Sequence, residues 1–151
     1  MIKKNAFGLL IALLLLSTQV KSQDSGFGIG MILGDPTGIS LKGWLNDVNA
    51  IDASVSWSFQ HNGFFNITAD YVWHFDLIPV TKGKFPLYVG PGARMGIGND
   101  FWLGARVPVG LDYMFEGAPV DIFIEIAPGL NLFPSTDFFI NGGIGARFFF
   151  E

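Results

Sequence analysis

The last stretch of the chain, residues 138–150, alternates between two kinds of side chain. Because successive side chains of a β-strand point to opposite faces, this stretch divides into two rows. The row that begins at Phe138 has no polar side chain, whereas the other is rich in glycine and carries one charged residue, Arg147. A strand with two such faces is suited to cross a bilayer as part of a closed barrel.

Seven further segments alternate with the same period and are bounded by Gly, Pro, Asn and Asp. With the last stretch they give predicted strands at residues 27–33, 39–45, 50–59, 64–75, 85–94, 101–115, 120–133 and 138–150. Short turns between them favour pairing of neighbours along the chain. We therefore predict an all-β fold, an eight-stranded antiparallel up-and-down transmembrane β-barrel.

Prolines inside the segments are the main objection to this assignment, because proline cannot donate to a sheet ladder. They are Pro86, Pro91, Pro108 and Pro128. We expect β-bulges to accommodate them. The alternation resumes in phase after each proline, so the assignment of faces is kept.

The chain begins with a pattern typical of secretory signal peptides. Lys3 and Lys4 precede an apolar run at residues 6–16, which is too short for a membrane-spanning helix, and small or short side chains lead to a cleavage site before Gln23. We predict a removed signal peptide at residues 1–22 and a barrel domain at residues 23–151. The absence of Cys excludes lipidation at that site and a disulfide framework.

Charge and composition narrow the class of protein further. Of nine basic residues, three precede the cleavage site, so six remain against thirteen acidic ones, a balance of about minus seven that argues against a nucleic-acid partner. Charged residues make up 15% of the chain, where a soluble domain has about a quarter. No later segment has the roughly 18 consecutive apolar residues of a membrane helix, so membrane insertion would require a barrel.

The polar rows decide which face of the strands points outward. They consist mostly of Gly and Ser, which suit the filling of a narrow barrel better than a solvated surface. Apolar rows facing lipid are therefore the favoured interpretation, and the alternative is an exported soluble calyx with those rows around a lipid-like ligand. Aromatic residues near one end of the strands predict an interfacial girdle made of Tyr71, Trp73, Phe75, Phe85, Tyr113, Phe115, Phe148 and Phe150.

The charged residues of the polar rows are predicted to face the lumen together. They are Lys42, Asp52, Asp70, Arg94, Arg106, Asp112, Asp121, Glu125 and Arg147. Near balance of charge in a narrow interior favours a paired network that seals the lumen, and the alternative is the constriction of a narrow pore for small solutes or ions. A last hairpin that closes at residues 134–137 places Glu125 opposite Arg147, with Gly110 on the other side of Glu125.

Candidate catalytic chemistry is sparse. His61 and His74 are the histidines of the chain, and neither can be placed with a nucleophile or with enough ligands for a metal. The connections predicted on the outer side are short, at 34–38, 60–63, 95–100 and 134–137. Those predicted on the periplasmic side lie at 46–49, 76–84 and 116–119. Short outer loops argue against a receptor, an adhesin or a protease. Because candidate nucleophiles and metal ligands are also sparse, we predict no enzyme activity, no metal and no cofactor.

Several motifs also carry a family resemblance that spans nearly all of residues 23–151. They are the segments at 34–40, 70–74, 106–111, 121–128 and 143–148. The chain resembles an uncharacterised family of small bacterial outer-membrane barrel proteins related in architecture to the OmpA and OmpX type. The resemblance implies the barrel fold and a place in the cell outer membrane, with no known activity. Proteins of this wider class end in an aromatic residue read by the barrel-assembly machinery, and here Glu151 follows Phe150.

The function predicted from these observations is structural. We expect a small porin-like barrel, monomeric and in contact with outer-membrane lipid, that stabilises the membrane and has a lumen filled by side chains and salt bridges.

Overall fold

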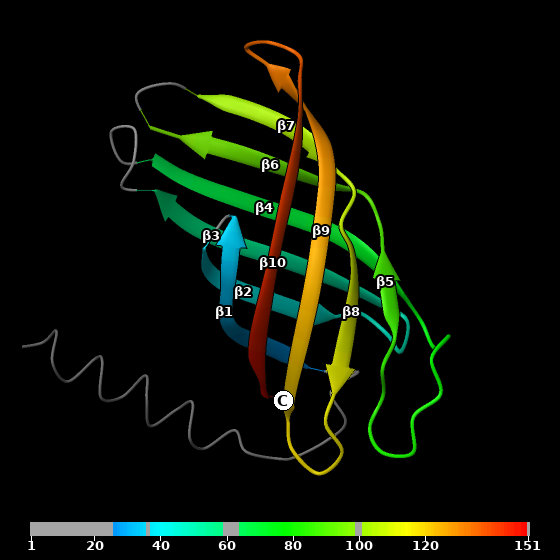
Figure 1. Ribbon diagram of the computed structural model, residues 1–151. Coiled ribbons are helices and arrows are strands. Elements are labelled where there is room, and N and C mark those ends of the chain that lie inside the picture. Colours follow the sequence, from blue (N-terminus) through cyan, green and yellow to red (C-terminus); the bar gives the residue numbers. More distant parts are fainter. Residues whose placement is uncertain (1–25, 36, 59–63, 99–100, 151) are drawn as a thin grey trace, which may run out of the picture.

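The computed structural model describes residues 26–35, 37–58, 64–98 and 101–150, and within them every regular element is a strand (Figure 1). The strands are β1 (Phe27–Asp35), β2 (Gly38–Trp44), β3 (Asn49–Ser58), β4 (Phe64–Phe75), β5 (Leu87–Val89), β6 (Gly92–Ile97), β7 (Trp102–Arg106), β8 (Val109–Met114), β9 (Val120–Phe133) and β10 (Asp137–Phe150). Over these ranges there is no helix long and apolar enough to cross a membrane. The predicted signal peptide and His61 lie outside the described residues.

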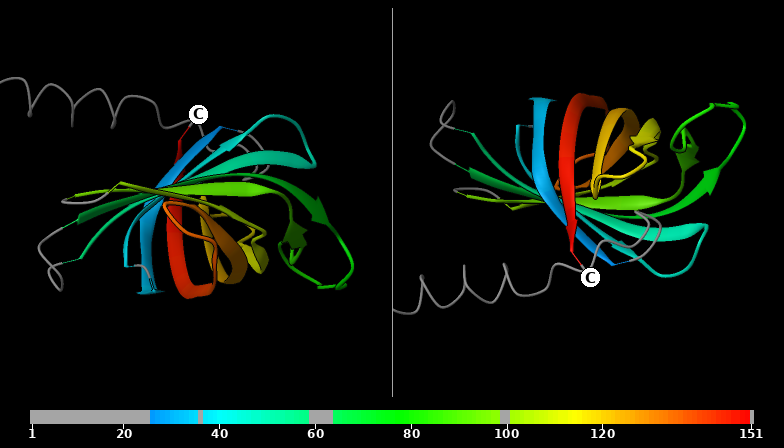
Figure 2. Two further views of the ribbon diagram at one scale, coloured as in Figure 1. Left: turned by 90° about the horizontal axis from the view of Figure 1, so that it is seen from above. Right: turned by 90° about the horizontal axis from the view of Figure 1, so that it is seen from below.

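The strands form one antiparallel sheet that closes on itself. Strands β1 to β4 pair in chain order, and β10 closes the ring by pairing with both β9 and β1. Strands β5 and β6 run one after the other along β4, and β7 and β8 do the same along β9, so ten strands make the eight walls of the ring. Figure 2 shows the same sheet from above and from below. The predicted eight-stranded antiparallel up-and-down barrel is confirmed.

The breaks between β5 and β6 and between β7 and β8 occur at prolines. Tyr71 N–H donates to the Pro91 carbonyl at 2.9 Å, and Val107 N–H donates to the Pro128 carbonyl at 2.9 Å. In both pairs the proline accepts a ladder bond and cannot return one. The register between the walls is the same before and after each break, so no residue is inserted. The expected bulges at these prolines are wrong, and the register shift of this region lies between Leu103 and Gly104 instead.

The registers together fix the tilt of the strands. Partners in adjacent strands can be followed once around the barrel, from Phe138 through Leu130, Ala105, Ala93, Ala69, Ala53, Leu41 and Ile29 to Phe148. The path returns to β10 ten residues beyond its start. With about 3.3 Å per residue and about 4.7 Å between strands, this stagger corresponds to a tilt of about 40°.

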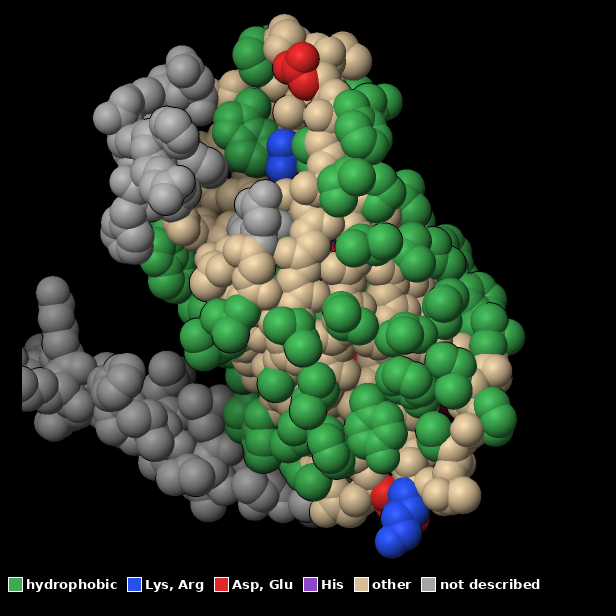
Figure 3. Space-filling view, viewed as in Figure 1, with side chains coloured by type: hydrophobic (Ala, Val, Ile, Leu, Met, Phe, Trp, Pro, Cys, Tyr) green, Lys and Arg blue, Asp and Glu red, His purple; other side chains and the backbone are tan. Residues whose placement is uncertain are grey.

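The apolar rows face outward along the whole barrel. On β9, Ile122, Ile124 and Ile126 are 43%, 55% and 60% exposed, whereas Asp121 and Phe123 between them are buried. Figure 3 shows hydrophobic side chains over the outer wall and charged ones near its two ends. Both predicted faces are therefore found, and the soluble calyx, which needs the apolar rows inside, is wrong.

The inward glycines make room for large side chains of the neighbouring strands. A Cβ added at Gly28 would lie 2.6 Å from the Phe149 ring, and added Cβ atoms at Gly110 and Gly145 would likewise overlap Tyr88 and Phe123. Tyr88 and Phe123 belong to a buried cluster with Ile32, Ala50 and Val72. The lumen is thus filled by alternating small and large residues, as in other narrow barrels.

Candidate functional site

Lys42 is the centre of the charged cluster nearest the 76–84 connection. It lies opposite Asp52 in the β2–β3 pair, on the inner face, and is fully buried. Its Nζ donates to Asp112 Oδ2 at 2.9 Å, lies 2.6 Å from His74 Nε2, and approaches Asp52 Oδ1 to 3.8 Å. The Trp44 ring is also near Nζ, at 4.7 Å from its centroid. The ammonium group of Lys42 on β2 thus contacts side chains of three other strands, β3, β4 and β8.

Arg147 holds the other side of the same cluster through Asp121. Its Nε and Nη2 donate to the two carboxylate oxygens of Asp121 at 3.0 and 2.9 Å, a bidentate geometry. Nη2 also reaches Asp112 Oδ2 at 3.4 Å, and Nη1 lies 3.7 Å from Asp52 Oδ1. The guanidinium rests over the Phe123 ring, 4.1 Å from its centroid. All three carboxylates are buried.

The partner of Arg147 differs from the predicted one. Arg147 lies opposite Asp121 in the β9–β10 ladder, and Glu125 lies opposite Gly143. The predicted register is therefore wrong by four residues. The reason is that Asp137, assigned to the turn, begins β10 and pairs with Asn131. An error of four, being even, leaves every side chain on its predicted face.

Arg106 forms a second cluster with Asp70 and Glu125. Its Nε and Nη2 donate to the two oxygens of Asp70 at 3.0 and 3.1 Å, and Nη2 also donates to Glu125 Oε1. Tyr88 Oη donates to Glu125 Oε2 at 2.7 Å. Gly110 faces Glu125 in the β8–β9 ladder, as predicted, and the Tyr88 ring occupies the space beside it. The sequence analysis did not assign Tyr88 to the lumen site, although its position in an inward-facing row indicates that it points into the lumen.

Arg94 lies nearer the opposite end of the lumen. Its Nε and Nη2 donate to Asn131 Oδ1 at 3.3 and 2.9 Å, and Nη1 donates to Asn141 Oδ1 at 3.2 Å. Its guanidinium carbon also lies over the rings of Phe139 and Trp102, 3.3 and 4.4 Å from their centroids. The nine predicted lumen charges therefore face inward, and eight of them fall into the two carboxylate clusters.

The residues of the predicted girdle lie together on the outer face of one end. Ring pairs form between Tyr71 and Trp73, Phe85 and Tyr113, Tyr113 and Phe115, and Phe148 and Phe150, with centroids 4.8 to 5.9 Å apart. Phe75 is 42% exposed beside them.

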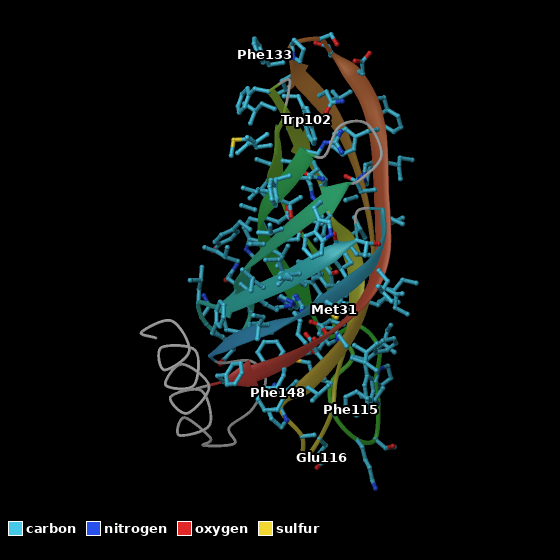
Figure 4. All side chains as sticks on the ribbon, turned by 90° about the vertical axis from the view of Figure 1, so that its left-hand side faces the viewer. Met31, Trp102, Phe115, Glu116, Phe133 and Phe148 are labelled. Carbon is cyan, nitrogen blue, oxygen red and sulfur yellow. The ribbon has the colours of Figure 1, made fainter. Side chains whose placement is uncertain are left out.

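A second aromatic band, not predicted from the sequence, lies at the other end. It consists of Trp57, Phe65, Phe101, Phe133 and Phe138, all exposed. Figure 4 shows Phe133 at one end of the barrel and Phe115 and Phe148 at the other. Strand β4 joins the bands from Phe65 to Phe75, and β10 joins them from Phe138 to Phe148. At about 3.3 Å per residue and a tilt of about 40°, ten residues span about 25 Å along the barrel axis.

Reactive chemistry is not assembled in the part of the chain that the structure describes. There, no three His, Asp or Glu side chains are grouped so that they could hold a metal ion. His74 Nδ1 lies 3.0 Å from the Val48 carbonyl and its Nε2 faces Lys42, so both ring nitrogens are engaged.

Comparison with known proteins supports the fold. A solved structure described as the N-terminal β-barrel domain of Pseudomonas aeruginosa OprF is similar, with a TM-score of 0.62 and 17% sequence identity. The match covers 85% of this chain and 98% of that one. No protein-family model and no curated protein sequence matches. The barrel architecture is thus supported, and the narrower resemblance to one family of small barrels stays a prediction.

Proposed function

We propose that this protein spans the cell outer membrane as a small barrel with a structural, membrane-stabilising role and a sealed lumen. The observation that carries the proposal is the apolar outer wall between two aromatic bands about 25 Å apart. An apolar band of about 25 Å with aromatic residues at both edges is what a transmembrane barrel presents to lipid. Of the nine charged residues assigned to the lumen, seven are buried on the inner face, where lipid does not reach them.

The packing of the lumen supports a sealed barrel. Lys42, Asp112 and Asp121 are fully buried, and Arg147 is 2% exposed. Tyr88 and Phe123 fill the space around them. A buried network whose members are paired on several sides is costly to break, because removal of one partner leaves a buried charge without its counter-charge.

The partners that fit this role are outer-membrane lipids, through the outer wall, and the barrel-assembly machinery, through the C-terminal strand β10. Strand β10 closes the ring against β1 and ends in Phe148, Phe149 and Phe150. We infer no enzyme activity, since the inner polar groups hold one another and, among the residues that the structure describes, no nucleophile is placed beside a base.

The proposal is tested by isolating the protein from membranes. We expect it to fractionate with the outer membrane, to need detergent for solubility, and to migrate faster on a gel before heating than after. A protein that stays in solution without detergent, with one gel mobility, would contradict the proposal. Loss of outer-membrane integrity on deletion, measured by entry of a dye that the intact membrane excludes, tests the stabilising role.

A narrow pore for small solutes or ions is the second candidate. It is favoured by a small cavity among polar side chains in the middle of the lumen, lined by Ser40, Ser54 and Thr68 among others. Conductance across a planar bilayer distinguishes the two: the sealed barrel gives none above the lipid background, and discrete current steps would favour the pore.

A further inference from the structure

The inner face of β2, β3 and β4 carries two polar rows that cross the three strands. In one row Ser40 lies opposite Ser54, and Ser54 lies opposite Thr68. In the next row Lys42 lies opposite Asp52, and Asp52 lies opposite Asp70. A cavity of about 20 Å³ adjoins both rows, which is room for one particle of the size of a water molecule.

Asp52 lines this cavity with an acceptor that receives no hydrogen bond. Its side chain is 8% exposed, and its Oδ1 is buried without a donor among the described residues. Lys42 Nζ and Arg147 Nη1 lie 3.8 and 3.7 Å away, beyond hydrogen-bond distance. Lys42 donates to Asp112, and Arg147 donates to Asp121. A buried carboxylate oxygen left in this way costs free energy unless something donates to it or coordinates it.

The charges around the cavity do not balance. Its lining includes three carboxylates, of Asp52, Asp70 and Glu125, and two guanidinium groups, of Arg106 and Arg147. Arg106 gives its bonds to Asp70 and Glu125, and Arg147 also serves Asp121 and Asp112. Two carboxylates directly opposite each other on one face, such as Asp52 and Asp70, repel. With Lys42 and the carboxylates of Asp112 and Asp121 included, the two clusters hold five carboxylates against three cationic groups, so negative charge is in excess around the cavity.

We propose that the cavity binds one small monovalent cation, held by the Asp52 carboxylate with the hydroxyl oxygens of Ser54 and Thr68. Those two hydroxyls share a hydrogen bond at 2.6 Å, so lone pairs remain on both. Oxygen ligands suit hard cations such as Na⁺. The cavity accepts a single unhydrated ion, and the nearby Lys42 and Arg147 disfavour a second positive charge. A proton carried on Asp52 supplies the same charge, and the test separates these two sources.

The test is equilibrium unfolding in urea, with the folded protein in an uncharged detergent at constant ionic strength. Chloride salts of Na⁺ and of choline are compared, because choline is too large for the cavity. We expect a higher midpoint in Na⁺. Above the dissociation constant, each tenfold rise in Na⁺ should multiply the folding equilibrium constant by about ten. Asp52→Asn should abolish this dependence, Ser54→Ala should shift it to higher Na⁺, and Asp137→Asn, at the exposed first residue of β10, should retain it.

A pH series in choline identifies the other source of charge. The unfolding midpoint could be independent of Na⁺ but dependent on pH. If Asp52→Asn removed that pH dependence, the positive charge would be assigned to a proton. Equal midpoints in both salts at every pH would overturn the proposal and leave a neutral water in the cavity. Sodium dependence that persists in Asp52→Asn would overturn it as well. Should Asp52→Asn fail to fold, an unchanged Na⁺ dependence in Ser54→Ala decides against the site. The cation site requires only the folded barrel. A negative result for cation binding therefore leaves the proposed membrane role unchanged.

Discussion

Arg147→Met is the substitution that tests the lumen network most directly. It leaves Asp121, which is fully buried, without the two hydrogen bonds that hold its carboxylate. Asp112 loses one partner and keeps Lys42 at 2.9 Å. Breaking a buried pair by removing one member costs about 3–5 kcal/mol, and this is the loss we expect in the free energy of unfolding. Urea unfolding in detergent, followed by tryptophan fluorescence and by gel mobility, measures it.

A pair of double-mutant cycles then assigns the partner. Asp121→Leu should also cost several kcal/mol, but its combination with Arg147→Met should cost less than the sum by about 1–3 kcal/mol, because the two side chains are in contact. The matched control is Glu125→Gln with Arg147→Met, which should be additive within about 0.5 kcal/mol, because Glu125 is held by Arg106 and Tyr88. Additive losses at 121 and 147, with coupling at 125 and 147, would refute the observed register.

Three further predictions concern the wall and its packing. Cysteines placed singly at Val107 and Ile124, which are 45% and 55% exposed on the outer face, should react in membranes with a lipid-soluble thiol reagent and not with a water-soluble one; rapid aqueous labelling would contradict a lipid-facing wall. Val107→Arg should lower the free energy of unfolding by about 2–4 kcal/mol, since Val107 lies midway along its wall between the aromatic bands, and a neutral result would place it outside the bilayer core. Gly110→Ala should destabilise the barrel because its Cβ would overlap the Tyr88 ring, whereas Gly43→Ala, with nothing within 4 Å, should be nearly neutral; equal effects would show that the lumen is loosely packed.

The faces of the strands could be predicted from the sequence because alternation is a local property. Ile124 and Phe123 differ by one position, and burial separates them as the pattern indicates. Strand continuity was less accessible. The pattern passes through Pro91 and Pro108 without a change of phase, so it reveals neither the break in the ladder nor the absence of a bulge. The second aromatic band was also missed, because Trp57, Phe101 and Phe133 stand next to loops. The rings of Phe101 and Phe133 meet only in the closed barrel.

The register of the last hairpin could not be predicted because the hydrophobic pattern is the same for several registers. A slip of two or four residues keeps every apolar side chain facing outward, so burial of apolar area hardly distinguishes the alternatives. The charges do distinguish them. With Glu125 opposite Arg147, Asp121 would sit beside Asp112 with Arg147 displaced by four residues along the strand. A buried carboxylate that loses its cationic partner costs several kcal/mol of stability. In the observed register Arg147 holds Asp121 through both oxygens, while Arg106 holds Asp70 and Glu125. Among registers with the same faces, the pairing of the inward charges therefore selects the one that forms.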